Sequence, residues 1–395
     1  MIGLKIPCPI QTLMTLKGSD NVKQQEKIRI GVLFGGRSGE HEVSLMSARS
    51  VLSVLDPGKY AVTQIGITHD GQWFSGENAL DALASGDTSS LTHVTLLPEP
   101  GDNTLYAMHG TAQTAQLEPL TSLDVVFPVL HGSFGEDGTL QGLLEMAGLA
   151  YVGAGVLGSS VCMDKALFKD LLTAHNLPTP AYRVFQRSTV KNNMERVIEK
   201  VEQIGAYPLF VKPANMGSSV GVSKANGRSD LMEGLLEACR FDRRVLVEKG
   251  INAREIEVSV LGNDNPQASI PGEIIPSREF YSYEAKYIDD RSELLIPAPL
   301  DAEALQFIRE IAVKVYQVSD CAGMARVDFL VDKDTGEVYV NEVNTIPGFT
   351  RISMYPKLWE ASGLSYASLV DQLVELAFER KAERDQTEYQ YGRVE

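Results

Sequence analysis

Three oxygen-bearing side chains in the last third of the chain could bind a divalent cation. Asp328 lies in the run MARVDFLV, and Glu342 and Asn344 lie in EVYVNEVN, with the turn-forming sequence DKDTG between the runs. If the runs form a hairpin about Thr335, Asp328 faces Glu342, and Glu342 and Asn344 share one face because strand side chains alternate. Opposed carboxylates repel unless a cation lies between them, and carboxylate and amide oxygens suit Mg²⁺. The pattern favours a Mg²⁺ site over a solvent-facing surface hairpin, because the neighbouring residues of both runs are apolar.

A loop rich in glycine and serine follows a lysine in LFVKPANMGSSVGVSKA. Lys212 ends a short predicted strand, and Ser218 and Ser219 lie between two glycines before the next strand. The backbone N–H groups of such a loop can hold a polyphosphate while the lysine supplies positive charge. An ordinary hairpin turn is the alternative. The P-loop signature, which ends in Gly-Lys-Ser or Gly-Lys-Thr, is absent, so an ordinary P-loop nucleotide hydrolase is excluded.

A second glycine pattern resembles the dinucleotide-binding fingerprint. Gly153, Gly155 and Gly158 follow a predicted strand and open a helix. The acidic residue expected about 20 positions later is missing from LLTAHNLPTP, so the sequence disfavours a nicotinamide or flavin site.

Two further segments could contribute to a site. The stretch SREFYSYEAKYIDD is aromatic and charged, which is typical of a lid that excludes water, with a packed surface loop as the alternative. His131, in FPVLHGSFGEDG, follows a predicted strand at the edge where open α/β sheets bind ligands. A structural histidine is the alternative there.

Hydrophobic periodicity predicts the elements that position these residues. Strands alternate with helices over 28–155, which predicts a doubly wound parallel sheet with a polar surface insertion at about 75–121. Residues 156–251 combine helices with short strands in an α+β pattern. Residues 252–382 contain strands, the lid at 276–298 and a helix for which Asp301 is placed as the N-cap.

The composition indicates a folded protein without general affinity for polyanions. A length of 395 residues suggests two or three domains at roughly 100–200 residues each. Subtracting 52 acidic from 36 basic residues gives −16, which disfavours nucleic acid or anionic membranes as partners. Four scattered cysteines and the lack of a spanning apolar run favour a cytoplasmic protein. We expect residues 1–27 to be a disordered or expression-derived leader and 383–395 to be a polar tail.

Several motifs, taken in order, resemble those of the D-alanine–D-alanine ligases of the ATP-grasp superfamily. They are GGRSGEHEVS, HGSFGEDGTLQG, CMDK, FVKPANMGSSVGVSK, YEAKY, GMARVDF and NEVNTIPGFTRISMYPKLW. The resemblance runs from about Ile28 to about Arg380. It implies a three-domain ATP-grasp architecture of the α/β (α+β) class. It also implies ligation of two D-alanine molecules through a D-alanyl phosphate, with ATP and Mg²⁺, for peptidoglycan precursor synthesis.

The resemblance also assigns roles to residues that match the family motifs. ATP contacts are assigned to Lys165, Lys212, Ser219, Glu248, Lys249, Ile251, Glu255 and Lys286. Two Mg²⁺ ions, with Mn²⁺ as an alternative, are assigned to Asp328, Glu342 and Asn344. Substrate contacts are assigned to His131, Ser353 and Met354. Catalytic roles are assigned to Glu40, Ser218, Tyr287, Arg326 and Gly348.

The lid sequence also bears on which ligase the resemblance implies. Tyr287 in YEAKY resembles the dipeptide-forming type rather than the relatives that join D-alanine to D-lactate. The D-lactate activity and a non-catalytic nucleotide-binding relative are the alternatives. The implied partners are D-alanine and ATP, with no nucleic acid or membrane, and a homodimer is expected by analogy with the family.

Overall fold

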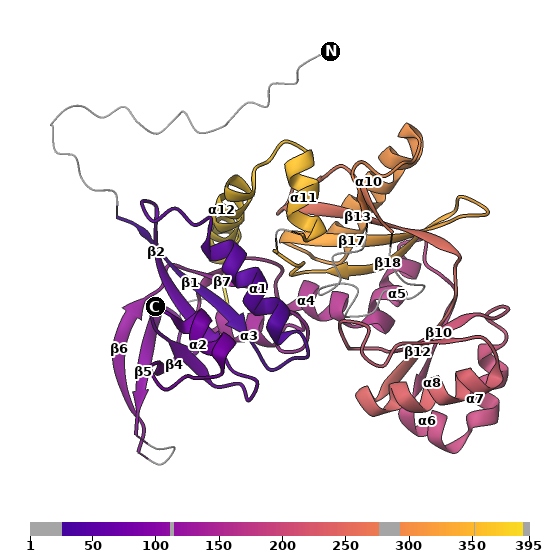
Figure 1. Cartoon of the computed structure of the whole chain (residues 1–395), viewed down its shortest axis with the longest axis horizontal. Helices are drawn as coiled ribbons and strands as arrows, with labels where there is room; N and C mark the ends of the chain where they lie inside the picture. Colours follow the sequence, from indigo (N-terminus) through magenta and orange to yellow (C-terminus); the bar gives the residue numbers. More distant parts are fainter. Residues whose placement is uncertain (1–25, 111–113, 276–292, 351, 390–395) are drawn as a thin grey trace.

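The computed structural model describes residues 26–110, 114–275, 293–350 and 352–389, whose strands form three sheets (Figure 1). Most of the leader expected at 1–27, most of the lid expected at 276–298 and the end of the tail expected at 383–395 lie outside these residues. No helix in the described ranges combines the length and the apolar character needed to cross a membrane.

The first sheet runs in the order β6-β5-β4-β3-β2-β1-β7-β8. Its strands are β1 Ile28–Gly35, β2 Tyr60–Ile67, β3 Trp73–Ser75, β4 Thr92–Leu96, β5 Thr104–His109, β6 Gln116–Ser122, β7 Val125–Pro128 and β8 Ala150–Tyr151. The helices that accompany them are α1 His41–Leu52, α2 Ala79–Ser85 and α3 Thr139–Met146. The expected parallel pairing holds for β2, β1, β7 and β8, whereas β3 to β6 pair antiparallel.

Residues 75–121 differ from the surface insertion that the sequence predicts. They form α2 and the strands β4, β5 and β6, which extend the sheet. Val94 and Leu105 are buried in the same apolar cluster as Leu33 and Ile65 of the parallel strands. The outermost strand β6 is exposed along most of its length, and its polar side chains conceal the period-two pattern of a half-buried strand.

The second sheet is antiparallel, in the order β11-β10-β12-β9. Its strands are β9 Tyr182–Gln186, β10 Leu209–Pro213, β11 Ser223–Ala225 and β12 Arg244–Lys249. Helices α6 Arg187–Asn192, α7 Met194–Val201 and α8 Arg228–Phe241 share its core. The sequence also places α4 Val156–Met163 and α5 Lys165–Ala174 in this domain, but Cys162, Phe168 and Leu172 pack into the core of the third sheet.

The third sheet runs β16-β15-β13-β17-β18, with β14 paired to β13. The strands are β13 Ala253–Gly262, β14 Gln267–Ala268, β15 Gly272–Ile275, β16 Glu293–Leu295, β17 Gly323–Asp332 and β18 Val338–Asn344. The helices are α10 Ala302–Val318, α11 Met354–Ala361 and α12 Tyr366–Arg384. The expected N-cap is confirmed, because Asp301 Oδ1 accepts the Ala304 N–H at 2.7 Å. The mixed α/β class and the hairpin register of Asp328 against Glu342 are confirmed as well.

Helix α12 ties the last part of the chain to the first sheet (Figure 1). Its residues Leu369 and Leu373 are buried in one apolar cluster with Ile30 and Val32 of β1. At its end, Arg380 donates to the Gly153 carbonyl at 2.8 Å and to the Glu145 carboxylate at 2.7 Å. Two segments far apart in the sequence therefore form one packed unit.

The glycine pattern that resembles a dinucleotide fingerprint has a packing explanation. A Cβ added at Gly158 would lie 2.4 Å from the Asp320 carbonyl oxygen, so this glycine lets α4 approach the chain between α10 and β17. Gly153 has a φ of +100°, a conformation that favours glycine.

Replacing Gly158 by alanine should lower the free energy of unfolding by about 1–3 kcal/mol, because backbone must move to admit the methyl group. Urea unfolding measures this change. Gly142→Ala is the matched control, since Gly142 also lies in a helix but has open space at its Cβ position. The control should be neutral or slightly stabilising. Equal stability of the two variants would contradict this packing role.

Candidate active site

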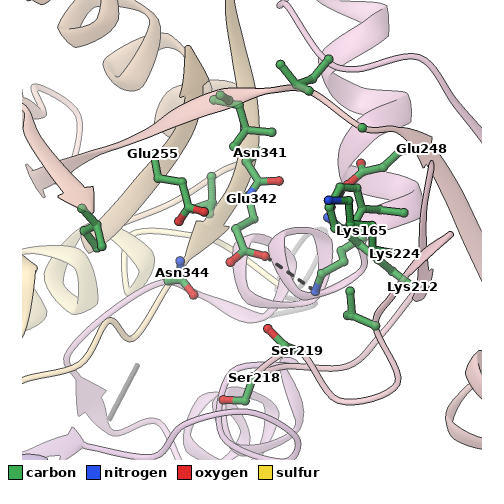
Figure 2. Close-up of a pocket in the computed structure, with 18 of the residues that line it drawn as sticks. Lys165, Lys212, Ser218, Ser219, Lys224, Glu248, Glu255, Asn341, Glu342 and Asn344 are labelled. Carbon is green, nitrogen blue, oxygen red and sulfur yellow. Dashed lines mark ion pairs between the residues drawn. The ribbon is translucent and has the colours of Figure 1, made fainter. Parts of the chain in front are cut away.

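A cleft of about 1040 Å³ lies between the second and third sheets and is closed on one side by loops of the first (Figure 2). Predicted residues that line it from the first two sheets and α5 are Glu40, Lys165, Lys212, Ser218, Ser219 and Glu248. The predicted residues that line it later in the chain are Lys249, Ile251, Glu255, Arg326, Glu342 and Asn344. Figure 2 shows the lysines on one side of the cleft and Glu255, Glu342 and Asn344 on the other.

The other predicted site residues do not line this cleft or lie outside the described residues. Asp328 lies behind Arg326 and Asn344, which both donate hydrogen bonds to it. His131, Gly348, Ser353 and Met354 are not among the lining side chains. Lys286 and Tyr287 lie outside the described part of the chain.

The acidic hairpin formed by β17 and β18 is neutralised by cationic side chains. Arg326 donates to both oxygens of Asp328 at 2.7 Å and lies 2.9 Å from the Glu257 carboxylate. On the cleft side, the Lys165 ammonium lies 3.9 Å from the Glu342 carboxylate (Figure 2). Because β13 pairs with β17, Glu257 is directly opposite Asp328.

The donor atoms of this hairpin fit a hard divalent cation. Glu342 lines the cleft with its carboxylate, and Asp328 lies at the paired position, where its oxygens accept from Arg326 and Asn344. Asn344 uses its amide nitrogen to bond Asp328 at 2.9 Å, which leaves its carbonyl oxygen as the atom that can serve as a ligand. An all-oxygen set of this kind suits Mg²⁺.

A buried carboxylate holds two of the lysines in place. Glu248 is 2% exposed, and its two oxygens form ion pairs with Lys212 and with Lys169, the latter at 2.8 Å. Burial alone would raise the pKa of Glu248, but the two ammonium groups outweigh burial and hold the pKa at about 2. Glu248 therefore stays charged and orients Lys212 at the wall of the cleft.

Glu40 meets the serine-rich loop at the end of the cleft. Glu40 is the N-cap of α1 and is 7% exposed, and the Ser218 hydroxyl donates to its Oε1. A Cβ at Gly132 or at Gly217 would lie 2.4 Å or 2.7 Å from Glu40 Oε2, so a larger residue at either position would displace the Glu40 carboxylate. Ser218 and Ser219 have φ of 47° and 58°, which is unusual for non-glycine residues and often found at functional sites.

Gly348 and Ser353 lie together at the start of α11. Ser353 is the N-cap of this helix, and its Oγ accepts the Thr350 N–H at 3.1 Å. A Cβ at Gly348 would lie 2.8 Å from that oxygen. The Met354 side chain is buried against Ile274, so only its backbone could contact a substrate. The positive end of a helix dipole makes this position suitable for a carboxylate.

Lys224, Asn341 and Glu136 are among the lining residues that the sequence did not single out. Asn341 lies in the cleft because the register of β17 and β18 shifts by one residue between Asp328 and Phe329. Such a bulge turns two consecutive side chains to one face, which strict alternation cannot predict. Lys224 and Glu136 lie within motifs quoted in the sequence analysis. Their charged side chains at those positions were the sequence signal that could have identified them as site residues.

Glu136 is a buried acid with two backbone donors. Its carboxylate accepts the Gly132 N–H at 2.7 Å and the Ile346 N–H at 2.9 Å. Burial and the nearby charge of Glu40 raise its pKa to about 8, although the two N–H groups act in the opposite direction.

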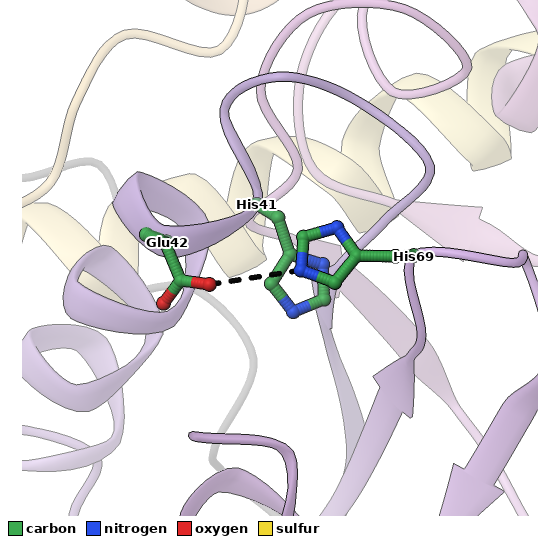
Figure 3. Close-up of side chains that lie close together, drawn as sticks. All are labelled: His41, Glu42 and His69. Carbon is green, nitrogen blue, oxygen red and sulfur yellow. Dashed lines mark ion pairs between the residues drawn. The ribbon is translucent and has the colours of Figure 1, made fainter. Parts of the chain in front are cut away.

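A separate cluster of His41, Glu42 and His69 does not have the geometry of a metal site (Figure 3). Its ligand atoms lie within 4.8 Å of one another, but the two imidazole rings stack at 3.8 Å between centroids. A nitrogen lone pair lies in the plane of its ring, so stacked rings do not aim their lone pairs at one ion.

Most of the chain is similar to known proteins. The family profile described as "D-ala D-ala ligase N-terminus" matches residues 29–154, and that described as "D-ala D-ala ligase C-terminus" matches residues 171–375. The D-alanine–D-alanine ligase of Natranaerobius thermophilus is 49% identical over 91% of this chain and 97% of its own length. That of Ruminiclostridium cellulolyticum is 50% identical over 90% of this chain and 96% of its own.

Two solved structures are also similar. The D-alanine–D-alanine ligase from Coxiella burnetii has a TM-score of 0.77 and 39% identity, and covers 92% of this chain and 97% of its own. The VanG D-Ala:D-Ser ligase from Enterococcus faecalis has a TM-score of 0.78 and 35% identity, and covers 89% of this chain and 100% of its own.

Replacing Glu248 by glutamine should destabilise the protein by on the order of 3 kcal/mol at pH 7, because the buried Lys169 and the partly buried Lys212 lose their counter-ion. The pKa of Glu248 is lowered in the folded state, so its contribution is present above about pH 4.5 and is lost as pH falls toward 2. The difference in free energy of unfolding between wild type and variant, measured with urea, should therefore become smaller below about pH 4.5. The exposed Glu233 on α8 supplies the control, Glu233→Gln. A difference in free energy of unfolding that does not change with pH would contradict the ion-pair role of Glu248.

Proposed function

The chain belongs to the D-alanine–D-alanine ligase family and ligates two D-alanine molecules in peptidoglycan synthesis, and we propose that the cleft carries this reaction with ATP and Mg²⁺. One observation supports the proposal above others. The acidic hairpin, two lysines and the Glu40–Ser218 contact converge on one cleft, although they come from segments far apart in the sequence. The same cleft would be too charged for an apolar ligand, but its charges suit a triphosphate beside a zwitterionic amino acid.

The first step activates a carboxylate that would otherwise resist an amine. An oxygen of the first D-alanine's carboxylate attacks the γ-phosphorus of ATP, ADP leaves, and a D-alanyl phosphate forms. Such a transfer depends on positioning and on neutralising phosphate charge. In our proposal Lys165 and Lys212 contact the phosphates, and Lys286 approaches from the predicted lid. When bound to Asp328, Glu342 and Asn344, Mg²⁺ would supply further positive charge at the phosphate oxygens.

The nucleotide contacts are assigned to the walls of the same cleft. Ser219 belongs to the loop that would cover the phosphates, while Glu248, Lys249 and Ile251 lie beside the adenine position and Glu255 beside the ribose. In this structure Glu248 is already the counter-ion of Lys169 and Lys212. We therefore propose that it acts on the nucleotide chiefly by orienting Lys212.

In the second step the amine of the second D-alanine attacks the carbonyl carbon, and phosphate leaves as a proton is released from nitrogen. The tetrahedral oxyanion needs donors that are already in place, and we assign Arg326 and the Gly348 N–H to that task. Glu40, held by Ser218, would receive the ammonium of the first D-alanine, and Tyr287 would join them from the lid. The carboxylate of the second D-alanine would lie at the start of α11, at Ser353 and the Met354 backbone.

The second substrate needs a direct test, because one structural neighbour is named a D-Ala:D-Ser ligase. The purified chain with ATP, Mg²⁺ and D-alanine should form the dipeptide and release one phosphate for each dipeptide. Parallel reactions add D-lactate or D-serine and resolve the products by mass spectrometry. Folded protein that releases no D-alanine-dependent phosphate would refute the function, and nucleotide binding without turnover would favour a non-catalytic relative. A cytoplasmic location and a homodimer remain predictions.

Replacing Glu342 by glutamine should lower the rate of dipeptide formation by at least about 100-fold, because one charged oxygen ligand is lost while shape is kept. Urea unfolding should change little. Glu337→Gln, on the exposed turn of the same hairpin, is the matched control and should keep wild-type activity. Wild-type turnover in Glu342→Gln, or loss of its fold, would count against the metal assignment.

A further inference from the structure

The loop that carries Gly348 is held by side chains of the first sheet's domain. This loop, residues 345–349, directly follows β18. Its backbone is contacted by Ser47 of α1 and by His131 and Glu136 from the loop after β7. All three side chains come from segments far from residues 345–349 in the sequence.

His131 lies at the centre of these contacts. Its Nδ1 is 3.0 Å from the Ile346 carbonyl oxygen, and its Nε2 is 3.0 Å from the Ser47 hydroxyl. A carbonyl can only accept, so Nδ1 carries the proton and Nε2 accepts the Ser47 O–H. The ring is 4% exposed, and burial lowers the pKa of His131, in keeping with this neutral form. Both ring nitrogens are therefore engaged away from the cleft, in contrast to the substrate contact that the resemblance implies.

Ser47 and Glu136 complete the attachment. The Ser47 oxygen accepts the Phe349 N–H at 3.3 Å, and Glu136 accepts the Ile346 N–H at 2.9 Å. The second Glu136 oxygen accepts the Gly132 N–H at 2.7 Å. Backbone groups on both sides of Gly348 are thus fixed by one hydrogen-bonded network across the contact between domains.

We propose that Ser47, His131 and Glu136 are positioning residues that set the orientation of the Gly348 N–H and thereby the rate of the amine-attack step. The proposal rests on the assignment of Gly348 as an oxyanion donor in the proposed function. Oxyanion stabilisation depends on donors within hydrogen-bond distance of the developing charge, and a misplacement of about 1 Å can cost about 100-fold in rate. The phosphorylation step forms no tetrahedral carbon, so it does not depend on this N–H.

Ser47→Ala tests the proposal, because it removes one donor and one acceptor of the network without adding bulk. Single-turnover reactions with enzyme in excess over ATP should be quenched at intervals, and ADP and dipeptide measured separately. We expect ADP to form within about twofold of the wild-type rate and dipeptide to form about 10- to 100-fold more slowly. A merely structural role would lower both rates together.

Ser44→Ala is the matched control on the same helix. Ser44 is equally buried and bonds the Gly35 N–H and the Val129 carbonyl, but not residues 345–349. Its variant should show a comparable drop in the urea midpoint with both rates near wild type. Glu136→Gln is a second test, since the amide cannot accept from both N–H groups, and it should again slow dipeptide formation selectively.

The outcomes separate the two proposals. If the wild type forms no dipeptide, the proposed function fails. If the wild type is active and Ser47→Ala behaves like Ser44→Ala, or Glu136→Gln slows both steps equally, the positioning role is overturned.

Discussion

Compensation of buried negative charge is the constraint on which the rest of the site depends. Carboxylates with little solvent exposure surround the cleft. Each carboxylate whose contacts are described above faces a cation or a hydrogen-bond donor. Arg326 forms ion pairs with Glu257 and Asp328. Lys165 lies opposite Glu342, and Glu248 forms ion pairs with both Lys169 and Lys212. A buried carboxylate without such a partner would be expensive, so the elements that carry the cations must stay in register with those that carry the acids.

This constraint makes the cleft a property of three sheets together. The lysines come from α5 and β10, the acids from β12, β13, β17 and β18, and Glu40 from the start of α1. Helix α12 holds the first sheet against the third through apolar packing and the contacts of Arg380. The network around Ile346 then joins the same two domains beside the cleft. A site assembled this way can respond to small shifts between domains, because its donors and acceptors are fixed to different cores.

The sequence predicted the parts of this site that depend on short-range rules. Period-two alternation and the turn at Thr335 were sufficient to place Asp328 opposite Glu342. The structure gives the glycine pattern at 153–158 a packing role, because Gly158 lets α4 approach the backbone at Asp320. Residues 75–121 were misjudged, because the polar outer strand conceals the sheet that it extends. Asn341 was missed, because a bulge breaks the alternation on which strand predictions rest.

The sequence by itself determined the kinds of chemistry available: hard oxygen ligands on one hairpin, lysines at strand and helix ends, and a glycine-serine loop. Those features follow from residue types and from local periodicity, which depend only on residues close together in the chain. Only the tertiary structure decided which cation neutralises which acid, and that His131 turns both nitrogens toward Ser47 and Ile346. Such pairings join residues that are distant in the chain. Burial selects them by the cost of leaving a polar group unpaired, and that cost depends on how the domains pack.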